Sequence, residues 1–366
     1  MHRLSLLACL FLLPLTGCGN DSAPANAQPG QTAAAPQHLA QAPQQADADS
    51  RASPKPAETK TFRDWIVGCD NGLACRAVAL APKDEIQPTL MLTLDRAAGP
   101  GAVPTVHVTG QEERLPPLTI SVDGTQLAKG GTAADGVVQF DGADAERIAA
   151  ALGNGRRLAV SDGTGKAIGS VSLSGAAAAL RWIDERQGRA GTSGALVARG
   201  TKADTAPAPA LPVIRAVPVR GEAALLDPAR VAAMKREAGC ETDRDLGPPQ
   251  AKPLGDRTLV LLPCSSGAYN LMMAVFTVRD GKHRPAQFDA PSGMSEDGSP
   301  IQNVVDGSFE NEVLTSFARG RGLGDCGIRQ EFVWDGTRFR LSRQEEMPEC
   351  RGSKVYLPTW RARVLR

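Results

Sequence analysis

The sequence predicts a mainly β protein with a few helices, an α+β fold in which two β-sandwich-like or β-meander domains follow a disordered tether. Three observations predict this fold. Short apolar segments separated by turn residues recur over 61–198 and again over 222–366, only three segments have helical periodicity, and residues 19–60 contain almost no large apolar side chains. Many short strands at close spacing are typical of sandwiches and barrels rather than of alternating β and α units. About 300 residues follow Thr61, which is a length typical of two domains.

The N-terminus has the pattern of a bacterial lipoprotein signal peptide over residues 1–17. A positively charged start is followed by the apolar run Leu4–Leu15, which is too short to be an ordinary membrane-spanning helix. Leu15-Thr16-Gly17-Cys18 has the form of a lipobox, in which the Cys18 thiol receives lipid. Gly19 replaces the aspartate of the usual inner-membrane retention signal, so we expect an outer-membrane lipoprotein that faces the periplasm of the cell envelope. A plain signal peptide with a coincidental cysteine is the alternative.

Residues 18–60 are expected to form a lipidated, disordered tether. Their Ala, Pro, Gln, Asp and Ser residues cannot bury enough apolar surface to offset the entropy lost on ordering. A segment of this composition would connect the lipid to the folded body as a flexible linker.

Cysteine usage indicates disulfide bonds. Of the eight cysteines, Cys9 is removed with the signal peptide and Cys18 carries lipid, which leaves Cys69, Cys75, Cys240, Cys264, Cys326 and Cys350. An even number in an oxidising compartment is typical of disulfides. Short loops cost less entropy to close, which favours the pairs Cys69–Cys75, Cys240–Cys264 and Cys326–Cys350 without excluding others. A zinc site is the competing interpretation, but no Cys-x-x-Cys spacing supports it.

The first domain, 61–198, is predicted to contain eight strands and two helices. The helices are Asp144–Leu152, followed by a left-handed Gly153, and a segment through Ala177–Arg186 that is capped by Ser174 and ended by Gly188. The predicted strands, several of which alternate apolar and polar side chains, are Asp64–Cys69, Ala74–Leu80, Thr89–Leu94, Thr105–Val108, Leu118–Val122, Val137–Phe140, Arg157–Val160 and Ala167–Leu173.

Residues 199–221 are proline-rich and are predicted to link the domains. The second domain, 222–366, begins with a helix from Asp227-Pro228, the preferred N-cap and first-turn pair, to Gly239. The strands that follow are predicted at Arg257–Leu262, Tyr269–Val278, Glu312–Arg319, Gln330–Trp334 and Arg338–Arg343.

The chemistry-bearing residues form no recognisable catalytic, cofactor or metal motif. His107 and His283 are isolated, and Gly163-Thr164-Gly165-Lys166 lacks the upstream glycine of a phosphate loop and is expected to be a turn. Ser265 and Ser266 have no base near them in the sequence. We therefore predict no catalytic, cofactor-binding or metal-ligating residues. Whether the protein is an enzyme stays open, and the sequence favours a protein that is not one. The balance of 41 basic and 40 acidic residues argues against nucleic acid as a partner.

A basic C-terminal segment provides a candidate binding face. Residues 319–366 carry eleven basic and six acidic side chains, with aromatic residues between them. Gly320–Gly327 is glycine-rich and ends near Cys326, which predicts a rigid loop. We expect Arg319, Arg321, Arg351 and Trp360 to form this face, because arginine and tryptophan are common interface anchors. The alternative is that these are ordinary half-buried strand residues and that the loop is only structural.

Several longer stretches resemble one protein family. They are Phe62–Trp65, Cys69–Asn71, Cys75–Ala77, Leu180–Arg189, Cys264–Asn270, Gly320–Gly327, Glu349–Gly352 and Leu357–Arg361. Together they resemble a family of proteobacterial envelope proteins of unknown function, over about residues 61–366. The N-terminal half, with Trp65, two close cysteines and Ser172–Gly175 before a helix, is similar to invasion-associated locus B proteins. That similarity implies a β-sandwich with a packed helix and supplies no catalytic residues.

These observations predict a non-enzymatic, lipid-anchored envelope protein that binds another envelope component. Its partners would be the membrane, through the lipid, and an envelope protein or an anionic wall or lipopolysaccharide group. A periplasmic hydrolase acting on cell wall or glycan is one alternative, and an inhibitor or soluble-ligand-binding module is another.

Overall fold

The computed structural model describes residues 52–82, 88–110, 115–241, 243–295 and 298–366. The predicted signal peptide, Cys18 and nearly all of the predicted tether lie outside the described residues. All described residues belong to one compact unit. In this part of the chain the prediction of a mainly β fold with three helices is confirmed. None of these helices is both long and apolar enough to cross a membrane.

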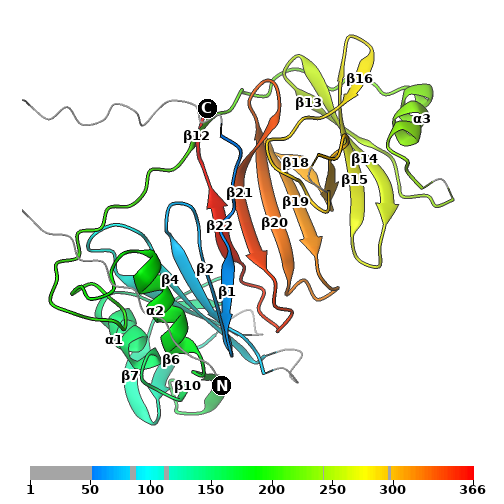
Figure 1. The fold of residues 1–366 in the computed structure, drawn as a ribbon. Coiled ribbons are helices and arrows are strands. Elements are labelled where there is room, and N and C mark those ends of the chain that lie inside the picture. The colour runs from blue at the N-terminus through cyan, green and yellow to red at the C-terminus, as the bar shows by residue number, and fades with distance from the viewer. Residues whose placement is uncertain (1–51, 83–87, 111–114, 242, 296–297) are drawn as a thin grey trace, which may run out of the picture. The chain divides into compact units, whose positions relative to one another are not determined.

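The first half of the described chain contains two antiparallel sheets (Figure 1). The seven-stranded sheet has the order β1-β2-β3-β4-β5-β9-β8, and the four-stranded sheet has the order β11-β10-β6-β7. The strands are β1 (Thr59–Phe62), β2 (Trp65–Cys69), β3 (Cys75–Ala79), β4 (Leu90–Arg96), β5 (Pro104–Gly110), β6 (Leu118–Val122), β7 (Thr125–Gly130), β8 (Thr132–Ala134), β9 (Val137–Phe140), β10 (Arg157–Asp162) and β11 (Ala167–Ser172). Burial alternates along β5 and β6, so each strand turns one face into a shared apolar core.

Two helices pack on these sheets. Helix α1 (Gly142–Leu152) contacts β5 and β7, and helix α2 (Ala176–Arg186) contacts β1, β2 and β3. The prediction of a left-handed Gly153 is wrong, because its φ is −70°. The prediction of a Ser174 cap is also wrong, because Gly175 with φ 99° occupies the N-cap position and makes no side-chain cap. A Cβ at Gly175 would overlap the carbonyl oxygen of Phe62, so glycine is required there for close approach.

The second half contains helix α3 (Pro228–Glu237) and two five-stranded sheets. Asp227 caps α3 as predicted, accepting a hydrogen bond from the Arg230 amide at 2.8 Å. One sheet has the order β13-β14-β15-β16 with β17 beside β15, and the other has the order β18-β19-β20-β21-β22. The strands are β13 (Gln250–Leu254), β14 (Arg257–Ser266), β15 (Leu271–Arg279), β16 (Lys282–Pro285), β17 (Asn303–Val305), β18 (Ser308–Glu310), β19 (Val313–Arg319), β20 (Gly327–Trp334), β21 (Phe339–Met347) and β22 (Leu357–Arg361).

The segment predicted as a linker is partly structured. Within 199–221, β12 (Val213–Arg215) pairs in parallel with β23 (Arg363–Leu365) near the end of the chain. The Val217 amide also donates to the carbonyl oxygen of Trp334 at 2.9 Å. The predicted domain boundaries stay a prediction. Residues 200–204 are bound to the first half and residues 213–217 to the second half, so the segment connects the two.

A small apolar cluster is built from both halves of the described chain. We call it the seam core, and its buried members are Ile66, Val78, Leu80, Cys326, Met347, Tyr356 and Leu357. Ile66 and Val78 point from the face of β2 and β3 opposite to the first core, and both are 0% exposed. The seam is continued by a backbone hydrogen bond from Ala57 to Thr359 at 2.8 Å. The two halves therefore complete one another's apolar surface.

Candidate functional site

The three predicted disulfides are confirmed. Cys69–Cys75 joins directly opposed residues of β2 and β3, Cys240–Cys264 joins the end of α3 to β14, and Cys326–Cys350 joins the start of β20 to the segment after β21. Each bridge closes a loop within one half of the described chain.

The candidate binding loop, Arg319–Gly327, is held in one conformation by several contacts. We call it the arginine loop. The Gly320 amide donates to Cys326 O at 2.8 Å, and the Tyr356 hydroxyl donates to Gly324 O at 3.1 Å. Gly327 has φ 136°, and a Cβ there would overlap Ala318 O, so this glycine is required by both its backbone angle and the space available. The loop presents its side chains on a preorganised backbone, as the sequence predicted.

The two loop arginines are partly exposed but already paired. The side chain of Arg319 is 30% exposed and donates to Asp306 at 2.5 Å and to Tyr269 O at 2.7 Å. The side chain of Arg321 is 34% exposed and engages both carboxylate oxygens of Asp325. Their positive charges are thus largely balanced, which weakens the expectation of a strongly anionic partner.

The Arg321–Asp325 pair is itself part of the loop's framework. Burial raises the pKa of Asp325, but the hydrogen bonds from Arg321 and from the Gly352 amide outweigh it and hold the pKa below its usual range. The hydrogen bond to Asp325 correspondingly raises the pKa of Arg321. Asp325 is therefore an anion at neutral pH, and it ties the arginine loop to the segment after Cys350.

The other two residues of the predicted face are buried, so the four do not form one surface. Arg351 is 9% exposed, and its guanidinium donates to Ala81 O, Arg63 O and Asp64 Oδ1 at 2.7–2.8 Å. Trp360 is also 9% exposed, packs in the core of the second half and donates to Leu341 O at 2.9 Å. The prediction of one exposed face fails at these two residues because Arg351 is buried in the contact between the halves and Trp360 is buried in the core of the second half.

Two exposed apolar or amphipathic residues that the sequence did not single out lie at the loop, Leu323 within it and Tyr269 against it. Tyr269 is 41% exposed and Leu323 is 38% exposed. The Tyr269 hydroxyl donates to Gly320 O at 2.9 Å, and its ring lies 3.6 Å from the ideal Cβ position of Gly322. We call Tyr269, Arg319, Arg321 and Leu323 the loop face. Tyr269 lies 51 residues before Gly320, so no local sequence pattern could connect the two.

The remaining candidates for catalysis are not assembled into a site in the described part of the chain. His107 lies 3.3 Å from Asp95, which is also bound by Arg76, and His283 lies 3.0 Å from Glu237 on a different sheet. The segment 163–166 is a turn, as expected, in which Asp162 accepts from the Thr164 and Lys166 amides. No group of three or more His, Cys, Asp or Glu side chains is placed to hold a metal ion among the described residues.

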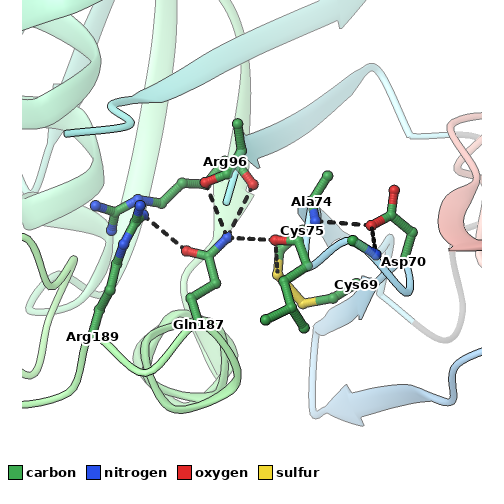
Figure 2. Close-up of a disulfide and its surroundings, with 10 residues drawn as sticks. Cys69, Asp70, Ala74, Cys75, Arg96, Gln187 and Arg189 are labelled. Carbon is green, nitrogen blue, oxygen red and sulfur yellow. Dashed lines mark hydrogen bonds between the residues drawn. A yellow bond between two sulfur atoms is a disulfide. The ribbon is translucent and has the colours of Figure 1, made fainter. Parts of the chain in front are cut away.

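A buried polar network adjoins the Cys69–Cys75 disulfide (Figure 2). The side-chain amide of Gln187, just beyond α2, donates to Leu73 O at 2.8 Å and to the carbonyl oxygens of Arg96 and Ala97 at 3.2 Å. Its oxygen accepts from Arg189 at 3.0 Å. Figure 2 shows Gln187 between Arg189 and the strand end at Arg96. One side chain thus fastens the segment after α2 to the sheet next to the disulfide.

The same network contains two buried ion pairs. Arg96 (4% exposed) lies 3.7 Å from Asp184 (0% exposed), and Arg189 (0% exposed) lies 3.3 Å from Asp204. Asp184 also accepts from three successive amides of residues 196–198 at 2.7–3.1 Å. No local sequence pattern marks the network, because one of its hydrogen bonds joins residues that are 114 positions apart.

Comparison with known proteins places the chain in a family. The model of a family described as "Protein of unknown function (DUF1176)" matches residues 59–364. The chain belongs to this family. It is 27% identical over 331 residues to the Uncharacterized protein YpfG of Escherichia coli (strain K12), covering 80% of this chain and 88% of that protein. The crystal structure of invasion associated protein b from Bartonella henselae aligns with 36% of this chain and 99% of its own, with 20% identity and a TM-score of 0.28.

Proposed function

We propose that this protein is a non-enzymatic, lipid-anchored protein of the cell envelope, held at the outer membrane through Cys18, that binds another envelope protein through the loop face. The three disulfides support an oxidising compartment, because such bonds persist mainly in exported proteins. We also propose that the N-terminal half is related to invasion-associated locus B proteins. This relation does not identify a ligand.

The observation that carries the binding role is the exposure of Leu323 on the arginine loop and of Tyr269 beside it. Tyrosine and arginine are enriched among residues that contribute most to protein interfaces. Because the loop is already ordered, binding through it costs less conformational entropy than binding through a mobile loop. Since Arg319 and Arg321 are paired with aspartates, a partner with both apolar and polar groups fits better than a purely anionic polymer.

Site-specific photocrosslinking in the native envelope tests this proposal. A photoreactive residue at Leu323 should yield one dominant protein adduct. The same residue at Leu225, which is 96% exposed in the second half, is the matched control and should not yield that adduct. Leu323→Glu should abolish the adduct formed from a photoreactive residue at Tyr269, whereas Leu225→Glu should not.

Two outcomes contradict the binding proposal. One is an identical set of adducts from positions 323 and 225, which indicates nonspecific contact. The other is crosslinking of position 323 to glycan or lipopolysaccharide alone, which would support an anionic wall component instead. Arg321→Ala is a poorer probe, because it removes the partner of Asp325, which is 1% exposed.

The anchoring part of the proposal has its own test. Cys18→Ser should release the folded body from the membrane fraction or block processing of the signal peptide. Unchanged membrane fractionation of this variant would contradict a lipid anchor at Cys18, whatever the crosslinking shows.

A further inference from the structure

The edge strand β1 and helix α2 each carry an aromatic side chain with a cation over its ring. Lys60 Nζ lies 5.4 Å from the ring centroid of Phe62, and the guanidinium carbon of Arg186 lies 5.5 Å from that of Trp182. Lys60 and Arg186 are exposed, whereas Phe62 and Trp182 are half-buried against the core of the first half. We call these four residues the α2 face.

Lys60 and Phe62 lie on the side of the sheet that α2 covers. They stand directly opposite Val67 and Trp65 of β2, which belong to the core of the first half, so they share that face of the sheet. Helix α2 packs on the same core and lies alongside β1, β2 and β3 (Figure 1).

The helix turns Trp182 and Arg186 toward β1. Asp184 lies on the flank of α2 that meets Arg96, the last residue of β4. Trp182 and Arg186 are four residues apart and occupy the opposite flank. Because the sheet order is β1-β2-β3-β4, the flank opposite to β4 is the one beside β1. The two aromatic side chains and their cations therefore belong to one surface.

The surroundings of the α2 face are positively charged. Seven exposed charged side chains lie in residues 52–63 and α2, the basic Lys55, Lys60, Arg63, Arg181 and Arg186 and the acidic Glu58 and Glu185. None of the five basic side chains forms an ion pair within the part of the chain that the structure describes. Asp184, the remaining acidic residue of α2, is buried and accepts from backbone amides. The surface thus has a net positive charge that attracts an anionic partner.

A membrane surface fits this combination of aromatic and basic side chains. Tryptophan is enriched at the boundary between lipid headgroups and the apolar core of a bilayer, and basic side chains near that boundary are attracted to anionic headgroups. Strand β1 is also the first element of the described chain. A lipid at Cys18 would therefore hold the α2 face close to the bilayer.

We propose that the α2 face lies on the anionic phospholipid surface of the membrane, with Phe62 and Trp182 at the level of the headgroups and Lys60 and Arg186 facing phosphate groups. This inference rests on the proposed function only for bringing the face near a membrane. The seam core uses the opposite side of β2 and β3, so contact with a bilayer leaves the second half free to bind a protein.

Vesicle binding by residues 19–366 tests the proposal without a lipid anchor. This chain contains the whole compact unit but neither the signal peptide nor Cys18. It should bind vesicles of phosphatidylcholine with about 30% phosphatidylglycerol and should not bind vesicles of phosphatidylcholine alone. High salt should weaken this binding, because it screens exposed charges.

Tryptophan fluorescence reports which surface touches the vesicle. Trp65, Trp334 and Trp360 are at most 9% exposed, so Trp182 is the tryptophan that a bilayer reaches. The emission should shift to the blue on binding and should be quenched by brominated phospholipid. Both signals should be lost in Trp182→Phe.

Two charge variants measure the electrostatic contribution. Lys60→Gln and Arg186→Gln should each weaken vesicle binding about fivefold. Arg236→Gln is the matched control, because Arg236 is likewise an exposed arginine in the last turn of a helix, in α3 of the second half. It should leave binding unchanged.

Several outcomes overturn the proposal. They are absence of binding, equal binding to the two kinds of vesicle, binding without a change of tryptophan emission, and equal losses in Arg186→Gln and Arg236→Gln. A photoreactive residue at Trp182 that crosslinks to protein rather than to phospholipid in the native envelope would assign the α2 face to a protein partner instead. Failure of the lipid anchor is a separate result, because fractionation of Cys18→Ser measures it and vesicle binding does not depend on it.

Discussion

Replacement of Arg351 by methionine should destabilise the protein more than any exposed substitution. Arg351 crosses the seam and donates to three acceptors of the first half, Ala81 O, Arg63 O and Asp64 Oδ1. Methionine retains much of the apolar stem but none of the donors, so the substitution isolates the hydrogen bonds from the packing. A buried acceptor that loses its donor costs about 1–3 kcal/mol, and breaking a buried ion pair costs about 3–5 kcal/mol.

The burial of the individual acceptors determines how much free energy of unfolding should be lost. The hydrogen bond to Ala81 O is buried, whereas the Asp64 side chain is 30% exposed and can recruit water. We therefore expect the free energy of unfolding to fall by about 3–4 kcal/mol for Arg351→Met and by about 1 kcal/mol for Asp64→Asn, which retains an acceptor.

Urea unfolding of the oxidised protein, followed by circular dichroism, measures these changes. Arg181→Met on the exposed side of α2 is the control and should change the free energy of unfolding by less than about 0.5 kcal/mol. The urea midpoint should move at constant slope, since the surface exposed on unfolding is nearly the same.

The decrease of stability at acid pH provides a second measurement of the contact between Arg351 and Asp64. Burial raises the pKa of Asp64, but the hydrogen bonds from Arg351 and Ser172 outweigh it, and the pKa lies below its ordinary value. Stability from this carboxylate is present above about pH 4 and is lost as the pH falls through the lower, folded-state pKa. The role assigned to Arg351 would be refuted if Arg351→Met lowered the free energy of unfolding by less than about 1 kcal/mol and left the decrease of stability at acid pH unchanged.

Three further predictions concern the arginine loop, the seam core and α2. Replacing both Cys326 and Cys350 by serine should lower the free energy of unfolding by about 3–4 kcal/mol, because the two cysteines are 24 residues apart in the sequence. Calorimetry measures this loss, with the Cys240/Cys264 double serine variant, whose cysteines are also 24 residues apart, as the comparison. Burial raises the pKa of Tyr356 to about 12, so its contribution to stability is present below about pH 10 and should be lost between about pH 10 and 12. The free energy of unfolding, measured with urea across this range, should fall by up to about 2–3 kcal/mol in the wild type and by less in Tyr356→Phe. Gly175→Ala should lower the melting temperature sharply because its Cβ overlaps Phe62 O, whereas Gly124→Ala, which also has positive φ but open space around it, should cost only about 1 kcal/mol.

The sequence predicted elements well where local pattern and burial coincide. The strands Leu118–Val122 and Val137–Phe140 are predicted with their observed bounds, the first because apolar and polar residues alternate and the second because its residues are mostly β-branched or aromatic. Helix α3 was predicted from its Asp227-Pro228 start. By contrast, β8 (Thr132–Ala134) is exposed along its whole length and has no apolar pattern to predict it. It forms because β9 offers a free edge to pair with.

The candidate site was harder to predict, because its determinants are distant in the sequence. Arginines are usually exposed, so Arg351 was assigned to a surface although its partners in the first half bury it. Arg96 received no assignment at all, since nothing near β4 indicates that a guanidinium would be enclosed there. The arginine loop was identified because glycines and a cysteine mark a constrained turn locally, whereas Tyr269 joins it from another strand-flanking turn.

The seam core has a consequence for the order of folding. Contacts of Arg351 with the first half span 270 to 288 residues, so they close some of the longest loops in the chain. Long-range contacts form late, because the entropy of loop closure opposes them until other structure is in place. If the chain is delivered from its N-terminus, Ile66, Val78 and Leu80 stay uncovered until residues 326–357 arrive. During that interval the outer face of β2 and β3 is an adhesive apolar surface, and a holding chaperone that shields it would increase the yield of native protein.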